Sequence, residues 1–297
     1  GLDRMNETPS QYSEALVTCE WLEAHLDDPD LVIFDCTTYL IPNEGSNRPY
    51  KVQSGQADYD KGHIPGSGYF DLQKDFSVAD SPFRFTLPPA QETAAAFAER
   101  GVSDGKRVVL YSRKSPQWAT RFWWMLRWLG FDNASVLDGG YDKWVADGHV
   151  TSTRPCTYPK GTFSLNVRPE LFVDKNVVQS AIGAADICTI NALTADLHSG
   201  NSPRYGRPGR VPGSVNVPAP TLLNPETMEM LPIEIVAQAF TRIGAEPGRR
   251  IIAYCGGGIA ATLDAFVLHE LGYRDIAVYD NSMSEWANDV SLPIEMD

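Results

Sequence analysis

One segment in the second half of the chain combines a cysteine with the backbone features that a reactive thiol needs. An apolar run at 251–254 ends at Cys255, three glycines follow at 256–258, and a helical pattern begins at Ile259. Glycines permit a tight turn whose N–H groups face inward and bind an anion, and the N-terminus of the next helix adds partial positive charge. Both features favour the thiolate form of Cys255, which is the nucleophilic form.

A strand, a cysteine and a loop in this order also occur in proteins of other function. A cysteine phosphatase needs an arginine after five intervening residues to bind the phosphoryl oxygens, and that position holds Ala261. A buried structural cysteine beside a glycine turn is the other alternative. Because α/β sheets bind ligands at the carboxyl ends of their strands, we favour a functional Cys255. The residues expected to bind the anion are Gly256, Gly257, Gly258, Ile259 and Ala260.

The elements that must position this loop occur twice, because the chain contains an internal repeat. Three short segments recur in the same order in both halves. They are GHIPGS at 62–67 and GRVPGS at 209–214, VVLYS at 108–112 and IIAYC at 251–255, and SVLD at 135–138 and AVYD at 277–280. The sequence therefore predicts one duplicated folding unit.

Each half alternates short apolar runs, typical of strands buried on both faces, with helical patterns that stop at a glycine. Strands are expected at 31–36, 108–112, 135–138, 187–190, 251–254 and 276–279, and helices at 91–100, 119–129, 233–243 and 259–271. This alternation predicts two doubly wound α/β domains, each with a mainly parallel central sheet flanked by helices. We expect a flexible leader at 1–12, an N-terminal domain at 13–148, a Pro-containing linker at 149–169 and a C-terminal domain at 170–297.

The balance of charges limits the partners of the chain. Its 297 residues include 25 basic and 38 acidic side chains, a net charge of −13, which argues against binding to nucleic acid or an anionic membrane surface. No apolar run approaches the roughly 18 residues of a membrane-spanning helix. The five cysteines lack CxxC or Cys/His spacing, so we expect no disulfide framework, metal or cofactor. We expect a monomer in a reducing, cytoplasmic compartment.

The glycine loop at 254–261, the paired GHIPGS and GRVPGS turns and the LDGGYDKW segment at 137–144 resemble the tandem-domain rhodanese family. That family contains thiosulfate and 3-mercaptopyruvate sulfurtransferases, and the resemblance extends over the chain from about Ser13 onward. It implies that Cys255 takes up a sulfane sulfur as a persulfide and passes it to cyanide or a thiol. In the first half Ser112 stands where the second half has Cys255, so this half is expected to be non-catalytic.

Every sulfur donor of this family is anionic, so the resemblance implies positive charge near Cys255. Arg204, Arg207 and Arg210 lie within seven residues, and Arg204 with Tyr205 resembles the Gly-Arg-aromatic motif that binds the donor. Arg207 is placed as the family's second arginine, just before the turn, and Arg210 replaces the usual histidine of that turn. We rank Arg204 first and Arg207 second as donor-binding residues.

The chain departs from both specificity patterns of the family. Mercaptopyruvate enzymes typically carry a serine two residues after the nucleophile and an Asp–His pair from the first domain, where this chain has Gly257, Gln73 and Phe85. Thiosulfate-preferring members commonly carry basic side chains inside the loop, where this chain has Gly256 and Gly257. We expect thiosulfate as the donor, because it needs only charge complementarity and an exposed thiolate. The alternatives are 3-mercaptopyruvate as donor, or a persulfide carrier that docks onto a sulfur-accepting partner protein without efficient turnover.

Overall fold

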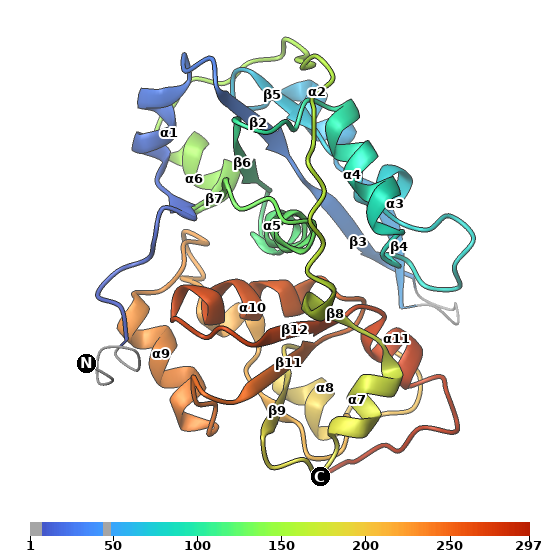
Figure 1. Ribbon diagram of the computed structural model, residues 1–297. Coiled ribbons are helices and arrows are strands. Elements are labelled where there is room, and N and C mark those ends of the chain that lie inside the picture. The colour runs from blue at the N-terminus through green and yellow to red at the C-terminus, as the bar shows by residue number, and fades with distance from the viewer. Residues whose placement is uncertain (1–7, 44–48) are drawn as a thin grey trace.

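Each half of the chain folds around a five-stranded parallel sheet (Figure 1). The computed structural model describes residues 8–43 and 49–297. The N-terminal sheet has the strand order β1-β7-β6-β2-β5, and the C-terminal sheet has the order β8-β12-β11-β9-β10 when it is followed from the matching edge. Neighbouring strands pair in parallel in both sheets. The two orders correspond strand for strand, which confirms the duplicated doubly wound α/β fold.

The central strands lie where the apolar runs predict them. The first sheet contains Leu16–Val17 (β1), Leu31–Asp35 (β2), Ser67–Tyr69 (β5), Arg107–Tyr111 (β6) and Ala134–Leu137 (β7). The second contains Phe172–Val173 (β8), Ile187–Asn191 (β9), Val215–Asn216 (β10), Arg250–Tyr254 (β11) and Ile276–Tyr279 (β12). The strands β1, β5, β8 and β10 at the sheet edges have two or three residues each, which is too short for a periodic signal in the sequence.

Helices cover both faces of each sheet. The first domain contains α1 (Cys19–His25), α2 (Gln56–Lys61), α3 (Leu72–Asp75), α4 (Ala90–Glu99), α5 (Gln117–Trp128) and α6 (Gly140–Ala146). The second contains α7 (Lys175–Ala181), α8 (Ala195–Ser199), α9 (Ile233–Arg242), α10 (Ala260–Glu270) and α11 (Ser282–Trp286). The four predicted helices are confirmed as α4, α5, α9 and α10. Among the described residues, no helix is long and apolar enough to cross a membrane.

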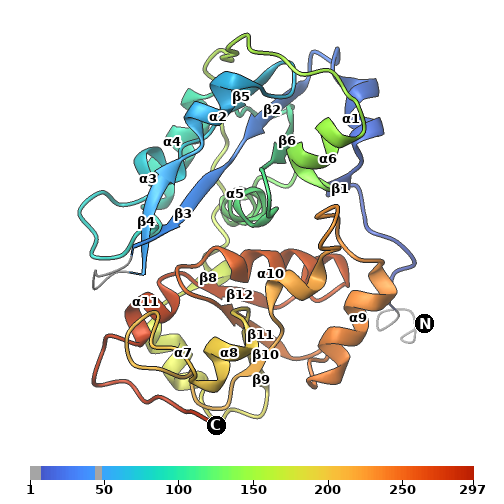
Figure 2. The same ribbon diagram turned by 180° about the vertical axis from the view of Figure 1, so that it is seen from behind.

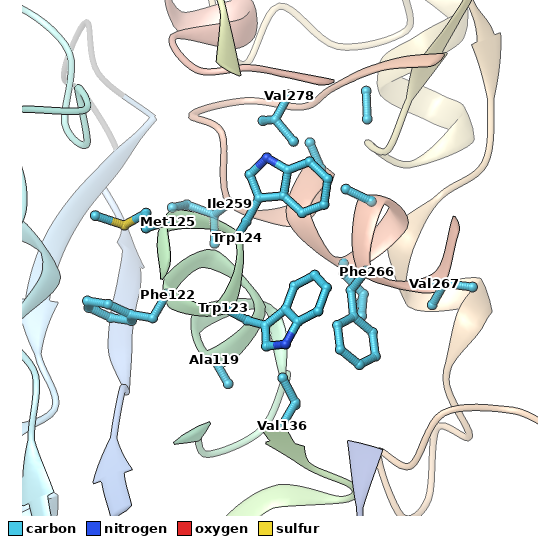
Figure 3. Close-up of a cluster of buried hydrophobic side chains, with 14 of the residues drawn as sticks. Ala119, Phe122, Trp123, Trp124, Met125, Val136, Ile259, Phe266, Val267 and Val278 are labelled. Atoms are coloured by element: carbon cyan, nitrogen blue, oxygen red, sulfur yellow. The ribbon is translucent and has the colours of Figure 1, made fainter. Parts of the chain in front are cut away.

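The two domains meet through equivalent helices, α5 of the first and α10 of the second (Figure 3). Thr120 and Thr262 occupy matching positions in these helices, and their hydroxyl oxygens lie 2.8 Å apart. Trp123 packs edge-on against Phe266, with ring centroids 4.8 Å apart, and Figure 3 shows these side chains between the two helices. One apolar core therefore continues from one domain into the other and holds them together.

The segment before β1 also contacts the second domain. Residues 1–7 of the expected flexible leader lie outside the described residues. Tyr12, within the same expected leader, donates a hydrogen bond to the carbonyl oxygen of Leu231 at 2.6 Å, and the neighbouring Ser13 donates to Glu270 of α10. The leader prediction therefore fails at Tyr12, because its half-buried phenol is bound to the second domain.

An antiparallel hairpin, β3 (Thr38–Pro42) and β4 (Tyr50–Ser54), extends from the first domain. Figures 1 and 2 show it reaching toward α11 of the second domain. The sequence alone does not predict this hairpin, because two five-residue strands of mixed exposure give a weak periodic signal. Its position beside the second domain brings residues of the first half to the region of Cys255.

Candidate active site

Cys255 lies between β11, the central strand of the second sheet, and the start of α10. Its side chain is buried, and it lines a cavity of about 590 Å³ at the carboxyl end of the strand. That edge is where parallel sheets bind ligands. Both domains contribute to the cavity, whose lining includes Tyr50, Arg84, Phe85, Gln117, Arg204, Tyr205 and Ser284.

Hydrogen bonds from α11 fix the orientation of the loop that follows Cys255. The N–H of Met283 donates to the Cys255 carbonyl oxygen at 3.0 Å, and the N–H and hydroxyl of Ser284 donate to the Gly256 carbonyl oxygen at 2.9 and 2.6 Å. In a trans peptide, a C=O and the N–H of the next residue point in opposite directions. The N–H groups of Gly256 and Gly257 therefore point away from α11.

Arg121 of α5 holds a third carbonyl of the loop from the other domain. Its fully buried guanidinium donates to the carbonyl oxygens of Gly258 at 3.1 Å and Phe85 at 2.9 Å, and lies 2.7 Å from a carboxylate oxygen of Asp280. The same peptide geometry turns the N–H of Ile259 away from Arg121. Sequence reasoning misses Arg121, although an arginine inside an apolar helix is a signal of a buried ion pair.

The loop offers an anion-binding set of backbone donors. Five consecutive backbone N–H groups have no hydrogen-bond acceptor within the described part of the chain. They are the N–H groups of Gly256, Gly257, Gly258, Ile259 and Ala260. All of these residues except Gly258 line the cavity. Gly258 instead shapes the turn, because its φ is +82° and a Cβ there would lie 2.3 Å from the Asp280 carbonyl oxygen. The arrangement suits negative charge on a sulfur attached to Cys255.

The phenol of Tyr205 lies directly over the loop. An added Cβ on Gly256 would come within 2.2 Å of the Tyr205 hydroxyl oxygen. Burial raises the pKa of Tyr205 well above its ordinary value, and the nearby Tyr50 and Cys255 add to the rise. Tyr205 therefore remains a neutral hydroxyl that can donate a hydrogen bond beside Cys255. Sequence reasoning places Tyr205 in the donor motif but gives its hydroxyl no role.

Arg204 is the predicted donor-binding arginine that the structure brings to the cavity. Its exposed side chain lies over the ring of Tyr50, with Cζ 5.9 Å from the ring centroid. Arg84 of the first domain lines the same cavity and donates to the Tyr50 carbonyl oxygen at 2.6 Å. Over the described residues, the lining contains no acidic side chain. The cavity therefore favours an anionic ligand.

We expected Arg207 and Arg210 to bind the donor as well. In the described part of the chain, however, neither arginine belongs to the lining of this cavity. The Arg210 guanidinium forms ion pairs with Glu295 and Asp297 near the end of the chain. The Arg207 guanidinium donates four hydrogen bonds of 2.7 to 3.0 Å to the carbonyl oxygens of Trp286, Ala287, Asp289 and Leu292. Both arginines thus stabilise the packing of the C-terminal segment, because their donors are already engaged there.

Two positions that differ from the mercaptopyruvate pattern lie side by side. A Cβ on Gly257 would be 3.5 Å from the ring of Phe85, and both residues line the cavity. Gln73, the third departure, lies in α3 and outside that lining among the described residues. The corner where the family pattern places a hydroxyl and an imidazole is therefore apolar in this chain.

The equivalent position in the first domain is occupied by structural contacts. The Ser112 hydroxyl donates to the Ser115 carbonyl oxygen at 2.7 Å. In the turn that repeats the GRVPGS segment, both ring nitrogens of the buried His63 lie 2.7 Å from backbone carbonyl oxygens, those of Tyr59 and Arg154. These contacts give Ser112 and His63 roles in folding.

One group of side chains with the composition of a metal site lies elsewhere. Glu20, Asp147 and His149 place ligand atoms within 4.8 Å of one another, and the two carboxylate residues are exposed. None of the three belongs to the lining of the cavity at Cys255. Exposed acidic groups commonly gather without an ion, so this group is not part of the reaction site.

Comparison with known proteins identifies the family of the chain. The model of the Rhodanese-like domain matches residues 18–147 and 192–289. These two segments cover most of both halves, so the chain belongs to the rhodanese-like family and contains two such domains in tandem. The resemblance carried by the glycine loop and the paired turns is thereby confirmed.

Similar proteins with named activities match across both domains. The chain is 31% identical to thiosulfate/3-mercaptopyruvate sulfurtransferase 1 of Arabidopsis thaliana, over 95% of this chain and 78% of the relative. It is 31% identical to the 3-mercaptopyruvate sulfurtransferase of Escherichia coli K12, over 94% of this chain and 97% of the relative. The crystal structure of SseA from Escherichia coli, a 3-mercaptopyruvate sulfotransferase, has a TM-score of 0.78 at 28% identity and covers 91% of this chain and 99% of its own. The protein is thus a member of a sulfurtransferase enzyme family.

Proposed function

We propose that this protein transfers a sulfane sulfur from an anionic donor, through a persulfide on Cys255, to a thiophilic acceptor. The position of Cys255 carries the proposal, since its side chain lines the cavity beside loop N–H groups that have no acceptor within the described chain. In this proposal the C-terminal half supplies the nucleophile. The N-terminal half supplies one wall of the cavity and the arginine, Arg121, that orients the loop.

We propose 3-mercaptopyruvate as the donor, in place of the thiosulfate that the sequence favours. The 3-mercaptopyruvate sulfurtransferase of Escherichia coli supports this change, and the relative from Arabidopsis thaliana is named for both donors. The loop supports it too, because Gly256 and Gly257 leave it without a cation to balance the second charge of thiosulfate. A keto acid carries one carboxylate, which Arg204 can bind at the cavity rim.

The first half-reaction is a displacement at sulfur. The Cys255 thiolate attacks the sulfur of the donor, an S–S bond forms, and the C–S bond of the donor breaks. The electron pair of the C–S bond stays on the carbon atom, which gives the enolate of pyruvate. This enolate takes up the proton of the donor thiol and becomes pyruvate. The persulfide anion that remains on Cys255 is stabilised by the N–H groups of Gly256, Gly257 and Ile259.

Intact-mass measurement after incubation with each donor tests the proposal. Wild-type protein should gain one sulfur atom, Cys255→Ser should gain none, and Cys188→Ser should behave as wild type because Cys188 is a buried cysteine of β9. The value of kcat/KM should be at least about tenfold higher with 3-mercaptopyruvate than with thiosulfate. Protein that gains no sulfur from either donor contradicts the proposal, and a persulfide that no small acceptor removes would favour the carrier function instead.

A further inference from the structure

The cavity at Cys255 is larger than the proposed donor requires. Its volume of about 590 Å³ falls in the range of roughly 300–1,000 Å³ for pockets that hold drug-sized ligands. 3-Mercaptopyruvate has seven non-hydrogen atoms. Even if each took up the ~30 Å³ that a water molecule occupies in the liquid, the donor would fill less than half of this volume. In a reaction through a covalent intermediate, donor and acceptor use the same cavity in turn. The unfilled space therefore points to the acceptor.

The walls of the remaining space are largely apolar and come from both domains. Leu40 of the hairpin and Phe83 line it from the first domain, and Leu193 and Leu197 line it from the second. Leu197 is buried and Phe83 is half-buried. Such walls favour a ligand with hydrocarbon surface and contribute little to the binding of cyanide.

The charged side chains of the described lining are all positive. Arg84 and Arg204 line the cavity, whereas the described lining includes no Asp or Glu. Arg204 forms no ion pair within the described chain, and its exposed guanidinium lies over the ring of Tyr50. A ligand that fills the apolar space is therefore met by a positive charge at Arg204.

We infer that the acceptor is an organic thiol with an apolar, ring-sized body and one anionic group, the body lying against Leu40, Phe83 and Leu193 and the anionic group facing Arg204. This inference rests on the proposed function. The acceptor thiol gives its proton to the Cys255 persulfide anion, the resulting thiolate attacks the outer sulfur, and a new S–S bond forms on the acceptor. The bond to Cys255 breaks, its electron pair leaves as the Cys255 thiolate, and the acceptor departs as a hydropersulfide that keeps the proton.

Four thiols separate body size from charge. They are 2-mercaptoethanol, mercaptoacetate, benzyl mercaptan and 4-(mercaptomethyl)benzoate. Protein is first loaded with the donor, freed of it and checked for the persulfide by intact mass, and the loss of the added sulfur is then followed in a single turnover. We expect 4-(mercaptomethyl)benzoate to react at least about tenfold faster than either mercaptoacetate or benzyl mercaptan. Equal rates for the four thiols, or the highest rate for mercaptoacetate, would overturn the inference.

Substitutions in the cavity walls test whether those walls cause the preference for a thiol with a ring and an anionic group. Phe83→Ala should reduce the advantage of the ring-bearing thiols, and Arg204→Gln should reduce the advantage of the anionic ones. Phe163→Ala is the matched control, because Phe163 is a half-buried aromatic that packs on Phe97 and Phe131 and does not belong to the described lining. Leu40→Ala replaces Phe83→Ala if the latter does not fold. A control variant that lost the preference equally would contradict the assignment.

A binding measurement keeps the inference separate from the proposed function. The unreactive 4-methylbenzoate is titrated into Cys255→Ser by calorimetry, with acetate and toluene as comparisons. We expect 4-methylbenzoate to bind at least about tenfold more tightly than acetate, and Arg204→Gln to remove most of this binding. Failure of persulfide formation alone would overturn the proposed function, whereas failure of 4-methylbenzoate to bind would overturn this inference.

Discussion

The ring of Tyr205 lies against the backbone of Gly256 so closely that a Cβ on Gly256 would meet the Tyr205 hydroxyl oxygen at 2.2 Å. Tyr205 is in turn held by Asn288, whose side-chain amide donates to the Tyr205 carbonyl oxygen at 2.7 Å. The glycine next to Cys255 thus has a steric reason in this chain. The phenol occupies the space that any other residue at position 256 would need.

Gly256→Ala should therefore move either Tyr205 or the loop. A displacement of about 1 Å is enough to cost roughly 100-fold in rate, so we expect persulfide formation to slow by about that factor. Rapid-quench mass measurement with 3-mercaptopyruvate checks this. Gly257→Ala is the comparison, because its Cβ would lie at an ordinary contact distance of 3.5 Å from Phe85. If both variants slowed equally, the contact with Tyr205 would not be the cause.

Tyr205→Phe keeps the ring and removes the hydroxyl. We expect the hydroxyl to donate to the anionic sulfur on Cys255 during the reaction, so its removal should slow sulfur transfer by about 10- to 100-fold while unfolding stability changes little. Tyr254→Phe should show the opposite pattern, since the Tyr254 hydroxyl is buried between Ser214 and the N–H of Val211. That variant should lose about 1–3 kcal/mol of stability. Thermal unfolding and single-turnover rates, measured on both variants, distinguish the two roles.

Arg204 and Arg207 should respond differently to the same substitution. Arg204→Gln should raise KM for the anionic donor by about tenfold or more with little effect on stability, because its side chain is exposed at the cavity. Arg207→Gln should lower the melting temperature, because it removes four hydrogen bonds to carbonyl oxygens, and the Leu292 carbonyl would keep no other donor within the described chain. A normal melting temperature for Arg207→Gln together with a raised KM would show that Arg207 binds the donor after all.

Arg121→Met should damage both the fold and the reaction. Removing one partner of a buried ion pair costs about 3–5 kcal/mol, because the Asp280 carboxylate loses its counter-charge and two carbonyl oxygens lose their donor. Arg127→Met on the same helix is the control, since Arg127 pairs with the half-exposed Asp132 and should cost below about 1 kcal/mol. Chemical denaturation gives the stabilities, and the rate of persulfide formation shows whether the loop has lost its shape. An Arg121 variant as stable as the control would contradict the burial argument.

Asp138 should make folding stability depend on pH. Burial raises the pKa of Asp138 to about 6 from its ordinary value of 3.8, with Glu229 adding to the rise, although the N–H of Met230 bonds its carboxylate at 2.8 Å. The folded state therefore holds this proton more tightly than the unfolded state. Stability is fully present below about pH 4 and falls as pH rises to about 6, by about 3 kcal/mol at most.

Asp138→Asn should remove this part of the pH dependence. The amide oxygen can still accept the Met230 N–H, so the bond between the domains survives without a buried charge. Unfolding free energies measured at pH 4.5 and pH 7 for both proteins check the prediction. The variant should gain stability relative to wild type at pH 7 and little or none at the lower pH. A wild-type protein with a flat profile across this window would contradict the raised pKa.

The sequence predicts the duplicated scaffold well because buried parallel strands and glycine-terminated helices leave strong local patterns. The strand at 251–254 is confirmed within one residue as β11, and the helix at 259–271 within one residue at each end as α10. The proposed nucleophile, Cys255, is predicted from the same local signal. The hairpin β3–β4 is not predicted, because its five-residue strands are stabilised by pairing with each other more than by a periodic apolar face.

The arginines show where prediction from sequence ends. Arg204, Arg207 and Arg210 are equivalent in charge and close in sequence, and only the folded chain separates the exposed guanidinium from two that are engaged by the C-terminal segment. Arg121 and Tyr205 act on the loop from segments remote in sequence. Such long-range contacts leave no spacing signal, because they depend on how the domains pack.

The bond from Arg121 to the Gly258 carbonyl has a consequence for the biogenesis of the protein. A ribosome releases the first half before the second, and domains generally fold in that order. With that order, helix α5 would be in place when the segment with Cys255 leaves the ribosome, and the loop would take its shape against a surface that already exists. The first half would thus provide the surface on which the loop after Cys255 takes its shape, and a second half made alone would lack the bond from Arg121 to that loop.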